Sequence, residues 1–159
     1  MTDESTPPAG RWRALVLVAL VELFVMALWF SATAVGPELA AAWGLSDGET
    51  ALLTSAVQLG FVAGALLSAA LTLSDTILPR HLFAGSAILG ALATALIAAV
   101  VESILPAALL RFATGMALAG VYPPGMKIMA GWFREGRGFA IGVLVGALTV
   151  GSALPHLLR

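Results

Sequence analysis

Long runs of apolar residues, separated by short polar or charged segments, make up most of this 159-residue chain. A helix of about 20 apolar residues crosses the hydrocarbon core of a bilayer. Runs of that length occur five times, so the pattern predicts an all-α protein, a polytopic membrane helix bundle with five transmembrane helices. The predicted spans are residues 14–36, 50–74, 82–101, 104–131 and 139–158.

Helix-breaking and polar residues mark the ends of the predicted spans. We expect Pro37 and Glu38 to end the first span. The segment from Ser46 to Glu49 is typical of an N-cap before the second span. Glu102 and Ser103 leave so short a turn that the third and fourth spans should be antiparallel neighbours.

The charges in the loops predict the orientation of the chain. Residues 1–13 are expected to be a disordered N-terminus, because the first ten are polar and rich in proline, and residues 14–159 to be the membrane domain. The positive-inside rule then places the N-terminus in the cytoplasm and Arg159 outside. Many Ala and Gly, with Arg preferred over Lys, favour a bacterial plasma (inner) membrane. The basic residues of one side are Arg11, Arg13, Arg80, Lys127, Arg134 and Arg137, and the acidic residues of the other are Glu38, Asp47, Glu49 and Glu102.

Composition narrows the class of protein further. Hydrophobic residues make up 60% of the chain and charged residues 11%, whereas soluble domains carry about 25% charged residues. The chain has no basic block, so nucleic acid is not an expected partner. It has no cysteine, which excludes a disulfide framework and thiolate metal sites. No metal-ligand cluster or phosphate-binding loop indicates a metal or another cofactor.

An enzyme is the main alternative from a different class, and the sequence disfavours it. Ser152 could act as an intramembrane nucleophile only with a histidine base within reach. His156 lies four residues away on the same predicted helix, and His81 lies near the cytoplasmic end of its span, far from Ser152. Neither histidine is well placed to activate Ser152, so no enzymatic activity is expected.

Small residues four apart recur along the predicted helices. Such stripes let membrane helices approach closely, so they predict the packing of a bundle and identify no function. The expected packing positions are Gly60 and Gly64 on the second helix, Gly115 on the fourth, and Gly138, Gly142 and Gly146 on the fifth, with Gly151 on an adjacent stripe.

Three segments carry a resemblance to a known family. They are Arg111 and Gly115 in the fourth span, residues 132–142 between the fourth and fifth, and Leu73, Asp75 and Arg80 between the second and third. Together they resemble the major facilitator superfamily of secondary transporters. In the last segment Leu71 and Leu78 stand where that family has glycines. The resemblance covers residues 11–159.

The resemblance implies a fold and a mode of action. Members have twelve helices in two halves, each half a pair of inverted three-helix repeats. The chain corresponds to the N-terminal portion, helices one to five, so we expect a fragment or truncated form that lacks its C-terminal helices. The implied function is secondary active transport of a small molecule or ion by alternating access, coupled to protons. The alternative is a small structural or regulatory membrane protein without transport activity.

Two charged residues inside the spans are the first candidates for the substrate or proton pathway. Glu22 lies midway along the first helix, with Met26 and Trp29 on the same face, and is a candidate proton carrier. The resemblance implies that helices one and four line the substrate cavity, which would bring Glu22 and Arg111 toward the same space. The alternatives are a Glu22 that reaches the interface or bonds a neighbouring helix, and an Arg111 with a purely structural partner.

Polar residues elsewhere add further candidates. Tyr122 shares the face of Arg111, and Gln58 lies within the second span, so both could contact substrate. Pro123 and Pro124 remove two amide donors and predict a kink just before them. The resemblance suggests that a cytoplasmic salt-bridge cluster gates transport, and its candidate residues are Asp75, Arg80 and Arg137. Solvated loop charge is the alternative for that cluster.

Overall fold

Eight helices make up the described part of the chain. The computed structural model describes residues 9–158, so Arg159 and most of the segment expected to be disordered lie outside the described residues. The first helix begins at Arg11, three residues before the expected span. The helices are α1 (Arg11–Ala34), α2 (Gly36–Trp43), α3 (Asp47–Ala70), α4 (Leu73–Thr76), α5 (Pro79–Val100), α6 (Ile104–Leu118), α7 (Tyr122–Trp132) and α8 (Arg137–Leu157).

Five candidate membrane spans are found among these helices, which confirms the all-helical membrane fold. They are α1, α3, residues 79–99 of α5, α6 together with α7, and α8. Large apolar side chains such as Leu17, Leu66, Leu89 and Leu109 are exposed on the outside of the bundle. Extensive exposed apolar surface of this kind suits a lipid environment.

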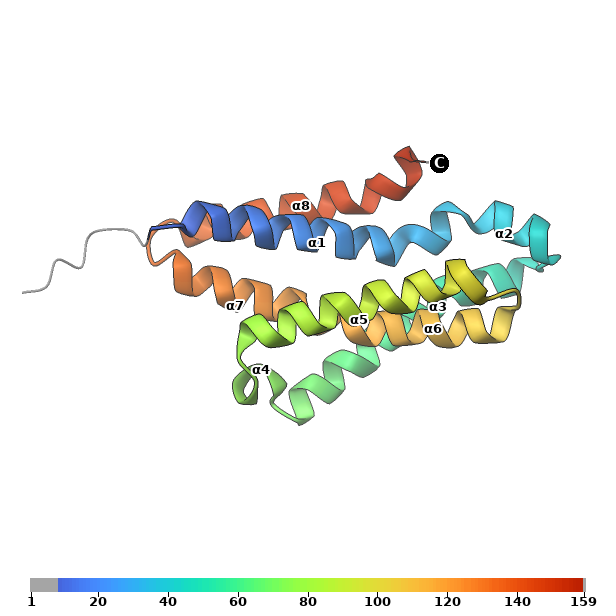
Figure 1. Cartoon of the computed structure of the whole chain (residues 1–159), viewed down its shortest axis with the longest axis horizontal. Helices are drawn as coiled ribbons and strands as arrows, with labels where there is room; N and C mark the ends of the chain where they lie inside the picture. The colour runs from blue at the N-terminus through green and yellow to red at the C-terminus, as the bar shows by residue number, and fades with distance from the viewer. Residues whose placement is uncertain (1–8, 159) are drawn as a thin grey trace, which may run out of the picture.

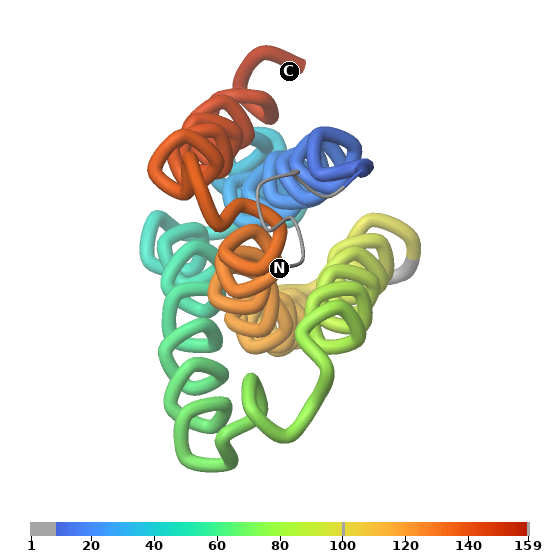
Figure 2. The backbone as a smooth tube through the Cα atoms, turned by 90° about the vertical axis from the view of Figure 1, so that its left-hand side faces the viewer, coloured from blue at the N-terminus to red at the C-terminus, as the bar shows by residue number. Residues whose placement is uncertain are grey.

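The helices pack around the span formed by α6 and α7. Seen end-on, this span lies in the middle, with α3 on one side and α5 on the other, while α1 and α8 lie side by side above it (Figure 2). The starts of α1, α5 and α8 gather at one end of the bundle (Figure 1). The expected basic segments therefore share one end, and α2 with the α5–α6 turn lies at the other.

The boundaries of α1, α2 and α3 follow from local chemistry. The side chain of Ser46 accepts from the amide of Glu49 at 3.3 Å, and Glu49 accepts from the amide of Ser46 at 2.9 Å. This reciprocal capping box starts α3, as predicted. The expectation for Pro37 needs correction: α1 ends at Ala34, and Pro37 lies in the first turn of α2. Proline suits that position, where an amide donor is not needed.

The fourth span is broken between α6 and α7. Helix α6 ends at Leu118 and α7 begins at Tyr122, so the expected kink is a full interruption of the helix. A continuous helix would require amide donors at Pro123 and Pro124, and neither residue has one. The interruption lies beside α1 and α3, where a cavity is found.

Glycine permits a close contact between α3 and α6. A Cβ atom on Gly60 would overlap the carbonyl oxygen of Phe112, and one on Gly64 would come within 2.6 Å of the carbonyl oxygen of Met116. From the other side, a Cβ atom on Gly115 would overlap the carbonyl oxygen of Val57. The two backbones therefore touch where glycine leaves room for them.

The glycines of α8 behave differently from the expectation. A Cβ atom on Gly138, Gly142 or Gly146 would meet nothing within 4 Å in the described part of the chain. The close contact of α8 instead uses Gly151, where a Cβ atom would overlap the carbonyl oxygen of Leu23 on α1. Spacing alone could not separate the two stripes, because both have the periodicity of a packing face.

Candidate functional site

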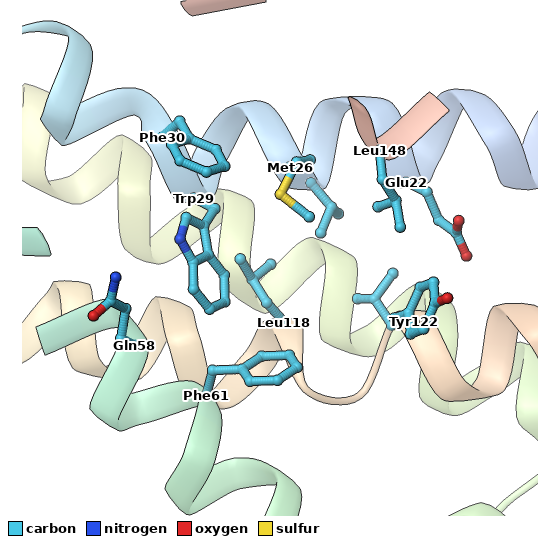
Figure 3. A pocket seen from close by; sticks show the side chains of 11 residues that line it. Glu22, Met26, Trp29, Phe30, Gln58, Phe61, Leu118, Tyr122 and Leu148 are labelled. Atoms are coloured by element: carbon cyan, nitrogen blue, oxygen red, sulfur yellow. The ribbon is translucent and has the colours of Figure 1, made fainter. Parts of the chain in front are cut away.

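A cavity of about 480 Å³ lies beside the interruption of the fourth span. Helix α1 supplies nearly half of its lining, and α3, α8 and the residues around the interruption supply the rest (Figure 3). Most of the lining is apolar. The lining residues are Glu22, Val25, Met26, Trp29, Phe30, Gln58, Phe61, Leu118, Val121, Tyr122 and Leu148.

Glu22 is the charged residue of this cavity. Its side chain is fully buried, and neither carboxylate oxygen has a hydrogen-bond partner among the described residues. Gly125 of α7 lies against it so closely that a Cβ atom there would overlap Oε1 of Glu22. A buried polar group without a partner carries a large desolvation cost, so the carboxyl group needs a proton or a ligand.

Gln58 and Tyr122 line the same cavity from different elements. Gln58 lies at one end of it, and Glu22 and Tyr122 lie at the other (Figure 3). Between them, the rings of Trp29 and Phe61 meet edge to face with centroids 5.2 Å apart. The structure thus brings three of the four predicted pathway residues to one cavity.

Arg111, the fourth predicted residue, does not line the cavity. Its side chain is 1% exposed, and its Nη1 donates to the carbonyl oxygen of Leu28 at 2.8 Å. Nη2 donates to the carbonyl oxygen of Trp29, and Nε donates to that of Leu53 at 3.4 Å. These carbonyls satisfy the guanidinium and tie α6 to α1 and α3.

The expectation that Glu22 and Arg111 share one space is therefore corrected. The carbonyl of Leu28 lies six residues beyond Glu22 on α1, which is about 9 Å along a helix. The direct partners of Arg111 are three backbone oxygens and the hydroxyl of Ser31, which lies 3.4 Å from Nη1, and the cavity is bounded by other side chains. No sequence pattern could have revealed this, since every residue carries a carbonyl group.

The predicted gating residues do not form one cluster. Nζ of Lys127 lies 2.9 Å from Oδ1 of Asp75 and also donates to the carbonyl of Ser74 at 2.7 Å. Arg137 donates through Nε to the carbonyl of Phe133, at 3.1 Å, within its own segment. Arg80 lies with Lys127 on the rim of a separate small cavity between α5 and α7.

The ion pair of Lys127 with Asp75 was not predicted from the sequence, where Lys127 served only as a positive charge that indicates orientation. The side chain of Lys127 joins α7 to Asp75 of α4, whereas the expected salt-bridge cluster combined Asp75 with Arg80 and Arg137. The available signal was its position on the half of the fourth span that was expected to lie toward the cytoplasm, on the same side as the loop that carries Asp75. The charge alone did not indicate which basic residue would reach that carboxylate.

Comparison with known proteins agrees with the resemblance seen in the sequence. The comparisons with curated proteins and with solved structures give no match. A family model described as Major Facilitator Superfamily matches residues 18–155, which include the cavity residues and Arg111. The predicted family and the absence of an enzymatic role are confirmed, because members of this family transport solutes and are not enzymes. The chain belongs to the Major Facilitator Superfamily.

Proposed function

We propose that this chain forms part of a secondary active transporter that moves a small solute by alternating access, with Glu22 as the proton-carrying group. The observation that carries the proposal is a fully buried carboxyl group without a partner, on the wall of a cavity of about 480 Å³. Ionisable residues inside membrane spans are costly and usually serve an ion or proton path.

The position of Glu22 supports coupling between proton and solute. The carboxyl group lies beside the broken fourth span, and Gly125 of α7 contacts it. A movement of α7 would change the space around Glu22 and its access to water. Broken helices at the binding site are a recurring feature of secondary transporters, because their free helix ends and unwound backbone can contact substrate and coupling ion.

Charge distribution supports an orientation with the N-terminus in the cytoplasm of a bacterial plasma membrane. The starts of α1, α5 and α8, where Arg13, Arg80 and Arg137 lie, share one end of the bundle. Positive residues favour the cytoplasmic side. On that side the ion pair of Asp75 and Lys127 would hold α7 against α4 in one state of the transport cycle.

The proposed pathway requires further helices. In this family the solute path runs between two six-helix halves. We propose that the C-terminal helices of the same polypeptide supply the second half. Sequencing the gene beyond the codon for Arg159 tests this, and seven further hydrophobic spans in frame are the expected result. A stop codon there would contradict this source of the second half, and a stop codon without a defined oligomer on cross-linking in membranes would contradict the transport proposal as well.

The cavity beside Glu22 disfavours the alternative, a small structural or regulatory membrane protein. Such a protein would need no space for a solute next to a buried carboxyl group. Tight packing around Glu22 would have favoured that role.

Proton movement in vesicles tests the proposed function. The full-length protein is reconstituted in liposomes that contain a pH-sensitive dye, and sugars, amino acids, organic anions and organic cations are added one class at a time. We expect one class to change the internal pH with the wild type, and Glu22→Gln to abolish that change. Glu102→Gln, at an exposed turn, is the matched control and should behave as the wild type.

Two results would contradict the proposal. In one, Glu22→Gln moves protons at the rate of the wild type. In the other, the correctly folded wild type moves no protons with any class of solute.

A further inference from the structure

We propose that the cavity beside Glu22 accepts lipophilic monocations, for which the Glu22 carboxylate is the counter-charge. The proposal rests on the proposed function, because it names the class of solute that the same cavity carries. Charge, wall chemistry and size each support it.

The charge of the cavity selects against anions. Glu22 is the one acidic residue in its lining, which contains no Lys, Arg or His. The nearby buried cation does not pair directly with Glu22, because the donors of Arg111 are directed at the carbonyls of Leu28, Trp29 and Leu53. An anionic solute would meet a carboxylate without a cation to pair with, whereas a cation would supply the partner that Glu22 lacks.

The walls favour an apolar or aromatic solute. Trp29, Phe30 and Phe61 line the cavity together with aliphatic residues, and the rings of Trp29 and Phe61 are in contact. Aromatic faces attract cations, and the attraction grows when water is excluded. A sugar would leave most of its hydroxyl groups unpaired, because only Gln58, Tyr122 and the indole of Trp29 offer further polar atoms.

The cavity has room for such a solute. Its volume of about 480 Å³ lies within the roughly 300–1,000 Å³ of ordinary small-molecule pockets. A carboxyl group can hold either a proton or a cationic solute as its partner. Binding of the solute should therefore weaken as the pH falls, and the proton and the cation should compete for Glu22.

Two ions of nearly equal size and opposite charge provide the test. Equilibrium dialysis measures the binding of tetraphenylphosphonium and of tetraphenylborate to the full-length protein in lipid nanodiscs, with empty nanodiscs as the blank. We expect saturable binding of the cation, at least about tenfold tighter than that of the anion. Glu22→Gln should weaken binding of the cation by about the same factor and remove the pH dependence of that binding, while Glu102→Gln should change neither.

The outcomes separate the two proposals. Equal affinity of the wild type for the two ions would overturn the proposal that the cavity accepts cations. This comparison needs no variant. Unchanged cation binding in Glu22→Gln would overturn that proposal as well. In either case the vesicle assay with the other solute classes still decides whether Glu22 carries protons. Absence of proton coupling in the correctly folded wild type with every solute class would instead overturn the proposed function itself.

Discussion

The guanidinium of Arg111 donates a hydrogen bond of 2.8 Å to the carbonyl oxygen of Leu28, and so joins α6 to the backbone of α1. The same side chain reaches Leu53 on α3, so one residue holds three spans together. Glu22, the other buried charge of the spans, has no such partner. We therefore propose different roles for the two charges: Arg111 fixes the bundle, and Glu22 remains available to a proton or solute.

Replacement of Arg111 should lower the stability of the bundle. Arg111→Met removes the donors to Leu28, Trp29 and Leu53, and we expect a loss of about 1.5–3 kcal/mol in the free energy of unfolding. The free energy of unfolding of Arg111→Lys should lie between those of Arg111→Met and the wild type, because one ammonium group cannot reproduce the fork of a guanidinium. Unfolding in mixed micelles, followed by tryptophan fluorescence, measures the difference.

Arg13→Met is the control for this experiment, because Arg13 is exposed at the start of α1. It should change the free energy of unfolding by less than about 0.5 kcal/mol. Equal effects of Arg111→Met and Arg13→Met would mean that the bonds to the carbonyls contribute nothing.

The spacing of residues on α1 was sufficient to predict one wall of the cavity. Glu22, Met26 and Trp29 are separated by four and three residues, so a helix must bring them to one face. The interruption of the fourth span also follows from sequence, because Pro123 and Pro124 cannot donate to the helix. These features depend on local geometry.

The short turn at Glu102 and Ser103 was sufficient to predict that α5 and α6 are neighbours, but the partner of each glycine stripe was beyond the reach of the sequence. The glycine spacing on α8 resembles that on α3, yet Gly142 faces open space and Gly60 touches the backbone of α6. A periodic stripe predicts a packing face without naming its neighbour. Arg111 donates to three backbone carbonyls and to the hydroxyl of Ser31. The partner of Asp75 is Lys127, which was one of several basic residues expected on the same side.

A side chain at Gly115 should disturb the contact of α3 with α6. Gly115→Ala forces a methyl group onto the backbone of Val57, so the helices must separate. Overpacking of this kind costs about 1–3 kcal/mol. Gly142→Ala is the matched control, since its methyl group meets nothing within 4 Å. If the two variants unfold at the same detergent concentration, the close approach of α3 and α6 is wrong.

The ion pair of Asp75 and Lys127 should affect the transport cycle more than stability. Its side chains are 76% and 48% exposed, and exposed pairs contribute about 0.2–1 kcal/mol. Asp75→Asn and Lys127→Met should therefore each shift the inward–outward balance by about 1.5- to 5-fold. The rate at which a cysteine in the cavity reacts with a maleimide reports this balance.

The double variant tests whether the two side chains act together. Combined, Asp75→Asn and Lys127→Met should shift the labelling rate no further than either does alone, because both remove the same contact. Asp47→Asn, at the start of α3, is the control and should leave the rate unchanged. Additive effects, or unchanged labelling in both single variants, would contradict a gating role.

The most direct test of the account is whether water reaches the cavity beside Glu22 in a membrane. The chain has no cysteine, so single cysteines can be introduced at Met26, which lines the cavity, and at Phe24, which is exposed on the outside of the same helix. In intact membranes a water-soluble maleimide should label Met26→Cys and leave Phe24→Cys unlabelled, because we expect lipid or the further helices to cover the outer face of α1. Equal labelling at both positions, or none at Met26→Cys, would contradict a solute pathway beside Glu22.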